Sequence, residues 1–260
     1  MTENMLEVTG LGHVYRAKEQ THTAFGDISF AVDRGEIVCI VGPSGCGKST
    51  LLRCLSGLLR PTSGTVSLHG TEVTEVPDEL AMVFQDYSRS LFPWRTVAGN
   101  IEFPLRGREL SKAQRRERVE EALSWVGLSG AATKYPWQLS GGMQQRVAIA
   151  RALAYRPMLM LMDEPFASVD AQTRAELEDL VLQVRAEHEM TVLLVTHDVD
   201  ESVYLGDRVL VLSKSPASVV ETLSVDLPAP RDQIGTRGAE EFVRLRTEVA
   251  QRIRNTAPTS

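Results

Sequence analysis

The sequence has 260 residues, enough for one large domain or for one domain with an insertion. Hydrophobic residues make up 43% of the chain and charged residues 24%, so the composition excludes wholesale disorder. The 28 basic and 34 acidic side chains argue against a generally basic face for nucleic acid. No apolar run approaches the roughly 18 residues of a membrane span, and the first residues resemble no signal peptide. Because Cys39, Cys46 and Cys54 cannot all pair, we expect a reduced, cytosolic chain.

The N-terminal third is predicted to consist mainly of strands. Residues 6–41 contain strand segments, because 28–32 alternates apolar and polar residues and 36–41 is a short apolar run. A helix is predicted over about 48–58, and the turn residues that follow end it. Short strands are then expected within 65–84.

From about residue 86 to residue 155 the pattern becomes helical. Helices are predicted over 111–126, with Ser111 as N-cap, and over 140–154. Beyond them, strands are predicted over 158–162, 191–195 and 208–212, and helices over 171–188, 199–205 and 239–254. Strands that alternate with helices predict an α/β fold with a parallel sheet, in which 86–155 is an insertion.

A glycine-rich loop lies between the apolar run at 36–41 and the first predicted helix. Its pattern, Gly-x4-Gly-Lys-Ser, lets consecutive backbone N–H groups point at phosphate oxygens, and the helix adds the positive end of its dipole. Lys48 can reach the β- and γ-phosphates, and the Ser49 hydroxyl can bind Mg²⁺. A chance glycine-rich turn is the alternative. The predicted nucleotide-binding residues of this phosphate loop are Gly42, Pro43, Ser44, Gly45, Cys46, Gly47, Lys48, Ser49 and Thr50.

Two carboxylates follow the apolar run Met158 to Met162. A buried parallel strand would deliver Asp163 and Glu164 at its C-terminal end, where ligands bind in open α/β sheets. Asp163 suits the Mg²⁺ site, and Glu164 is the candidate that polarises the attacking water. We expect strand alternation to point the two to opposite sides. Read alone, the pair could equally initiate a helix.

The segment Leu139-Ser140-Gly141-Gly142-Met143-Gln144-Gln145, here the signature segment, makes the resemblance specific. Together with the two sites above, the chain resembles the ATP-binding-cassette (ABC) ATPase family over nearly its whole length. The resemblance implies a P-loop NTPase fold with a mainly parallel sheet, an N-terminal antiparallel β portion and an inserted helical subdomain. It implies an ABC ATPase domain over 1–225, with the helical subdomain at about 86–155, and a C-terminal extension with one helix over 226–260.

The resemblance also implies roles for isolated residues. Tyr15 matches the aromatic that stacks on adenine, Gln85 the glutamine that links the Mg²⁺ site to the helical insertion, and His197 the switch histidine at the γ-phosphate. Ser168-Val169-Asp170 occupies the D-loop position, where Ala-Leu-Asp is common. Considered alone, Tyr15 is an ordinary strand tyrosine, Gln85 a solvated loop residue and His197 a structural histidine.

The resemblance further implies a homodimer with Mg-ATP between its subunits. Ser140, Gly141 and Gly142 would contact the γ-phosphate held by the other subunit's phosphate loop, and one copy of each motif per chain requires two chains. Ser140 alone could be only an N-cap.

The stretch from Phe84 to Trp94 resembles the ATPases of nitrate, sulfonate and taurine importers. That branch implies an ATP-hydrolysing energy-coupling subunit at the cytoplasmic face of the inner membrane. Its partners would be integral-membrane permease subunits and, indirectly, a periplasmic or lipid-anchored solute-binding protein. Residues 86–104 would contact the permease, with Phe92 and Trp94 as anchors or, equally, as a small local core. The alternatives are a soluble ABC-type ATPase of a non-transport machine and an ATP-bound scaffold.

Overall fold

The computed structural model describes residues 4–16, 21–86, 90–167 and 169–256. An antiparallel sheet of four strands begins the chain, in the order β2-β1-β4-β5. It confirms the expected antiparallel N-terminal portion. Its strands are β1 (Asn4–Arg16), β2 (Thr21–Asp33), β4 (Ser63–Leu68) and β5 (Thr71–Glu72).

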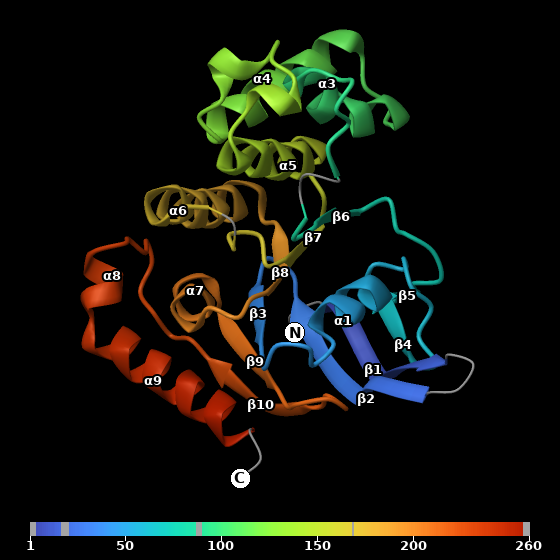
Figure 1. Ribbon diagram of the computed structural model, residues 1–260, viewed down its shortest axis with the longest axis vertical. Coiled ribbons are helices and arrows are strands. Elements are labelled where there is room, and N and C mark those ends of the chain that lie inside the picture. The colour runs from blue at the N-terminus through green and yellow to red at the C-terminus, as the bar shows by residue number, and fades with distance from the viewer. Residues whose placement is uncertain (1–3, 17–20, 87–89, 168, 257–260) are drawn as a thin grey trace.

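A second sheet of six strands lies at the centre of the molecule, in the order β10-β9-β3-β8-β7-β6 (Figure 1). Neighbouring strands from β9 to β6 pair in parallel, and β10 pairs antiparallel with β9 at the edge. The parallel α/β prediction is therefore confirmed. The strands are β3 (Ile37–Val41), β6 (Leu80–Val83), β7 (Leu159–Asp163), β8 (Thr191–Val195), β9 (Arg208–Leu212) and β10 (Val219–Ser224).

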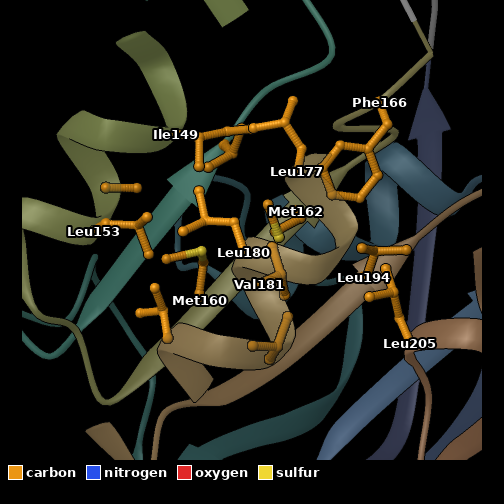
Figure 2. Close-up of a cluster of buried hydrophobic side chains, with 14 of the residues drawn as sticks. Ile149, Leu153, Met160, Met162, Phe166, Leu177, Leu180, Val181, Leu194 and Leu205 are labelled. Atoms are coloured by element: carbon orange, nitrogen blue, oxygen red, sulfur yellow. The ribbon is translucent and has the colours of Figure 1, made fainter. Parts of the chain in front are cut away.

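The central strands read as unbroken apolar runs because both faces of the sheet are covered. On β7, Met160 and Met162 face a core formed with α5, α6 and α7, whereas Leu159 and Leu161 face the opposite core beneath α1. Figure 2 shows Met160 and Met162 surrounded by side chains of these helices. Packing on both faces fixes β7, and with it the position of the carboxylates at its end.

Helices cover the sheet and extend beyond it. Several begin at a side-chain cap: Ser111 is the N-cap of α4, as predicted, and also forms a capping box with Gln114, while Asp170 and Asp198 cap α6 and α7. The α-helices are α1 (Lys48–Leu55), α3 (Val97–Glu102), α4 (Lys112–Trp125), α5 (Gly141–Tyr155), α6 (Ala171–His188), α7 (Val199–Leu205), α8 (Gly235–Gly238) and α9 (Glu240–Asn255), with 3₁₀ turns η1 (Phe103–Gly107), η2 (Ser129–Ala131) and η3 (Pro136–Gln138).

The helices α3 to α5 lie, in the chain, between the neighbouring strands β6 and β7. Figure 1 shows α3 and α4 at one end of the molecule, with α5 between them and α6, while α8 and α9 run along another side. Within the described ranges, no helix is long and apolar enough to cross a membrane. The strand β10 and the short helices α3 and α8 were not predicted.

Candidate functional site

The loops at the C-terminal edge of the central sheet enclose a cavity of about 540 Å³. Gly42, Gln85, Glu164 and His197 each follow the end of a parallel strand by one or two residues. Parallel strands end at the same edge, so loops far apart in sequence converge there. The described lining residues are Ser44, Gly45, Gly47, Lys48, Ser49, Thr50, Gln85, Glu164 and His197.

The phosphate loop takes a backbone path that only glycine accommodates. Gly45 and Gly47 have φ angles of 77° and 100°, in the left-handed region. A Cβ atom at Gly47 would lie 3.2 Å from the carbonyl oxygen of Ala24. Helix α1 begins at once with Lys48, so its unpaired N–H groups and dipole point into the cavity.

Lys48 is 6% exposed and folds back over the phosphate loop. Its Nζ donates to the carbonyl oxygens of Gly42 at 2.8 Å and Pro43 at 3.0 Å. The Cys46 backbone N–H is also engaged, because it donates to Pro43 at 3.3 Å. Burial raises the pKa of the Cys46 thiol, so its sulfur is an uncharged filler beside Lys48.

Asp163 is the last residue of β7 and is 6% exposed. Its Oδ1 accepts a hydrogen bond of 3.1 Å from the Ser49 hydroxyl at the start of α1. Burial raises the pKa of Asp163, and the Ser49 hydrogen bond opposes that rise. The pair places two oxygen atoms side by side at the edge of the cavity.

Glu164 lies beyond the strand, because β7 ends at Asp163 and Glu164 has a left-handed φ of 45°. A turn therefore sets its direction, and our explanation by strand alternation was wrong at this position. The Glu164 N–H donates to Val195 at 2.9 Å, which ties the turn to β8. Its Oε2 accepts from Gln85 Nε2 at 3.0 Å and lies 3.1 Å from His197 Nδ1. Three predicted residues thus meet at one oxygen.

Tyr15 stands beside the cavity near the end of β1 and is 40% exposed. Its hydroxyl lies 3.0 Å from Thr50 Oγ1, which fixes the ring beside the first turn of α1. The ring packs edge-on against His13, with centroids 4.6 Å apart. An exposed aromatic face anchored at its polar tip suits a planar base.

The signature segment lies elsewhere. Ser140 caps α5, and its Oγ accepts from the Met143 N–H at 3.3 Å, so the N-cap interpretation is correct. Ser140, Gly141 and Gly142 are not among the described residues that line the cavity. Figure 1 shows α5 towards the top of the molecule, whereas α1 lies lower, beside β4 and β5. Ser168 lies outside the described residues, and Asp170 accepts from the Thr173 N–H at 3.0 Å.

An apolar groove of about 360 Å³ opens between β6, η1 and the end of α5. Phe92 packs edge-on against Phe103 at 4.7 Å and belongs to a local cluster, whereas Trp94 is 71% exposed. Phe92 therefore belongs to a small local core, and Trp94, whose ring centroid lies 5.5 Å from that of Phe92, is exposed as an anchor would have to be. Sequence reasoning missed Phe103, which is 43% exposed, because only the packing of α5 decides which side it shows.

Comparisons with known proteins agree with this geometry. A family model described as ABC transporter matches residues 25–167. The nitrate import ATP-binding protein NrtC of Synechococcus elongatus is 44% identical to this chain over 231 residues. The match covers 88% of this chain and 35% of NrtC, so the chain spans about a third of the length of that relative. The aliphatic sulfonates import ATP-binding protein SsuB 1 of Xanthomonas axonopodis pv. citri is 46% identical over 223 residues, 85% of this chain and 87% of SsuB 1. Among solved structures, the dimeric post-hydrolysis state of the ATP-binding cassette MJ0796 bound to ADP and Pi has a TM-score of 0.77 and 33% identity, covering 85% of this chain and 99% of that one.

Proposed function

The chain belongs to the ABC transporter ATPase family and is an ATP hydrolase, and from this premise we propose that it is the energy-coupling subunit of an importer for nitrate, a sulfonate, taurine or a related small solute. The observation that carries the proposal is that Gln85 and His197 both contact the Glu164 carboxylate in the cavity that the phosphate loop lines. The names of NrtC and SsuB 1 support the class of solute.

The phosphate loop would hold the triphosphate of ATP. The cavity is lined by backbone N–H groups at the start of α1, and Tyr15 stands beside it with a face for adenine. Lys48 must release the carbonyl oxygens of Gly42 and Pro43 to reach the β- and γ-phosphates. Nucleotide binding therefore replaces two backbone hydrogen bonds of Lys48 by stronger bonds to anionic oxygen.

The site fits Mg²⁺. Ser49 and Asp163 provide oxygen ligands within 3.1 Å of each other, and such hard ligands are what Mg²⁺ prefers. Gln85 donates its Nε2 hydrogen to Glu164, so its Oε1 is the atom that would face the metal. Bound Mg²⁺ would neutralise charge that develops on the phosphate oxygens.

Glu164 would orient the attacking water, because its carboxylate is held at the cavity by Gln85 and His197. His197 contacts Glu164 through Nδ1 in this structure. A neutral imidazole has only one N–H donor. To donate to a γ-phosphate oxygen, His197 would therefore either give up its contact with Glu164 or carry a proton on both ring nitrogens. Positioning and electrostatics would supply most of the rate enhancement.

A second copy of the chain would complete the site. Ser140 and the N–H groups of Gly141 and Gly142 stand at the start of α5 and would meet the γ-phosphate of the other subunit. The dimeric MJ0796 structure supports this arrangement. The apolar groove beside Phe92 and Phe103, with Trp94 at its rim, would receive a helix of an integral-membrane permease. The subunit would then lie peripherally at the cytoplasmic face of the inner membrane, and the solute-binding protein would act on it only through the permease.

Growth of a deletion strain tests the proposed solute class. We expect loss of growth when nitrate is the sole nitrogen source, or when taurine or an alkanesulfonate is the sole sulfur source. The unchanged gene should restore growth, and the Glu164→Gln variant should not. Normal growth of the deletion strain on all three solutes would contradict the proposed solute class.

A further inference from the structure

The C-terminal extension packs against the helices that support the switch histidine. Figure 1 shows α8 and α9 along the side of the molecule next to α7, with α6 adjacent. Phe242, Leu245 and Val249 of α9 are buried. A helix attached by apolar packing alone would add only stability, but the polar contacts of the extension reach further into the molecule.

The extension supplies the cation for a buried carboxylate of α6. Glu178 is 1% exposed, and its Oε2 accepts from Arg237 Nη2 at 2.6 Å and from Gln233 Nε2 at 3.0 Å. Gln233 also donates to Asp179 of α6 at 2.8 Å, and the Arg237 guanidinium stacks over the Tyr204 ring of α7 at 4.7 Å. Arg237 therefore contacts both helices.

A second carboxyl faces Glu178 from α7. Glu201 is 4% exposed, and burial, followed by the charges of Glu178 and Asp198, raises the pKa of Glu201 to about 8. Within the part of the chain that the structure describes, Glu178 Oε1 and Glu201 Oε1 have no hydrogen-bond partner. Two buried carboxyls between two helices repel each other when both are ionised, and Arg237 offsets that repulsion.

The residues on either side of His197 depend on the spacing between α6 and α7. Asp198 Oδ2 accepts from Arg174 of α6 at 3.0 Å, and Asp198 Oδ1 caps α7 at the Glu201 N–H. Thr196 Oγ1 accepts from the Asp198 N–H at 2.9 Å, and the Thr196 side chain opposes the rise in the pKa of Glu201. A change in the separation of the two helices is therefore transmitted to both neighbours of His197.

We propose that the C-terminal extension positions His197, because Arg237 neutralises Glu178 and thereby holds α6 and α7 at the separation that keeps His197 beside Glu164. Arg237 and Glu178 are positioning residues in this scheme, and neither lines the cavity as the structure describes it. The inference rests on ATP hydrolysis by this chain and not on its assignment to an importer.

The test is ATP hydrolysis by the purified full-length chain with Mg-ATP. Arg237→Gln should lower kcat on the order of tenfold and leave KM for ATP within about twofold, because the phosphate loop and Tyr15 are untouched. Arg237→Gln combined with Glu178→Gln removes both charges and should restore kcat to within about twofold of the unchanged chain. Arg244→Gln breaks ion pairs on the exposed face of α9 and serves as the matched control with unchanged kcat.

The pH profile separates positioning from a general loss of stability. The kcat deficit of Arg237→Gln should be smaller near pH 6 than near pH 9, because a proton on the carboxyl pair replaces the missing cation. The groups that face the Glu178 and Glu201 carboxyls are Arg174 and Asp179 of α6, Asp198 at the N-cap of α7, Tyr204 of α7, Cys39 of β3 and Arg237 of the extension.

Three results would overturn the proposal: unchanged kcat in Arg237→Gln, a double variant as slow as the single one, or a deficit independent of pH. Circular dichroism shows whether Arg237→Gln folds. If it does not, Gln233→Ala carries the test, since it removes hydrogen bonds of the extension to Glu178 and Asp179 and no charge. It should lower kcat about threefold at unchanged KM, and an unchanged kcat would again refute the proposal.

Discussion

His197 holds its Nδ1 atom 3.1 Å from Oε2 of Glu164, although the two residues follow different strands. The same oxygen accepts a hydrogen bond from Gln85, which follows a third strand. A carboxylate with two such partners has a defined direction before substrate binds, as preorganised catalysis requires. The short link between Glu164 and His197 also means that displacement of either residue disturbs the other.

Glu164→Gln should preserve ATP binding and nearly abolish turnover. The amide keeps the shape of the side chain but cannot accept a proton from water, so kcat should fall about 10²- to 10⁴-fold. Because ATP then persists, the variant should accumulate as a dimer. Steady-state hydrolysis measures the first effect, and light scattering with and without Mg-ATP measures the second.

Glu120→Gln is the matched control, since Glu120 is an exposed residue of α4 that pairs with Arg116. It should hydrolyse ATP at the rate of the unchanged chain. Its light scattering with and without Mg-ATP should also match that of the unchanged chain. Turnover in Glu164→Gln close to that of the control would refute the role assigned to Glu164.

Tyr15→Ala should weaken ATP binding by about 1–3 kcal/mol, the range for loss of one aromatic–base stacking contact. Tyr15→Phe keeps the ring and loses only the contact with Thr50, so its dissociation constant should lie much closer to that of the unchanged chain. Fluorescent-nucleotide titration measures both constants. Equal constants for the alanine and phenylalanine variants would exclude stacking by Tyr15.

The phosphate loop and the apolar run before Asp163 were predictable because each is a local pattern with one physical meaning. The turn at Glu164 was not predictable, since a glutamate at φ 45° leaves no trace in the sequence and depends on its bond to Val195. The edge strand β10 was missed because its pairing with β9 is a tertiary contact. The Arg237–Glu178 pair joins residues 59 positions apart, and spacing alone cannot reveal such a contact.

Glu201 should make stability depend on pH. Its pKa is about 8 in the folded chain against an ordinary value of 4.5, so between these values the folded state retains a proton that the unfolded state has released. The stability that this retained proton gives to the folded state is fully present below about pH 4.5 and is lost as the pH rises towards 8. The free energy of unfolding should fall by up to about 1.4 kcal/mol for each pH unit in this window.

Glu201→Gln removes this titration. The free energy of unfolding of the variant, relative to that of the unchanged chain, should therefore rise from pH 5 to pH 8 and then level off. Urea unfolding of both chains at several pH values measures this difference. Glu189→Gln alters an exposed carboxyl and should follow the unchanged chain. Parallel stability curves for Glu201→Gln and the unchanged chain would show that Glu201 does not hold the proton.

Phe103→Asp should weaken attachment to the permease. The substitution places a charge at an apolar groove and removes an exposed ring, and loss of such an anchor costs about 2 kcal/mol or more. The measurement is the yield of integral-membrane protein that co-purifies with the tagged chain from solubilised membranes. Val220→Ala changes a half-exposed residue of β10 outside the groove and should retain the full yield. Equal yields for both variants would exclude the groove as the contact.

Two inactive variants should restore activity to each other if each site is shared between chains. Lys48→Ala removes the lysine of the phosphate loop, and Ser140→Ala removes the hydroxyl that caps α5 at the signature segment. In a mixed dimer, both defects fall in one site, whereas the other site combines an intact phosphate loop with an intact signature segment. An equimolar mixture forms mixed dimers in half of its pairings, so independent sites predict about one quarter of the unchanged activity. Mixing Lys48→Ala with Glu164→Gln is the control, because Lys48 and Glu164 line the cavity of the same chain, so both sites of a mixed dimer are defective and no activity should return. Activity of the first mixture no higher than that of its components would show that Ser140 serves the phosphate loop of its own chain or none.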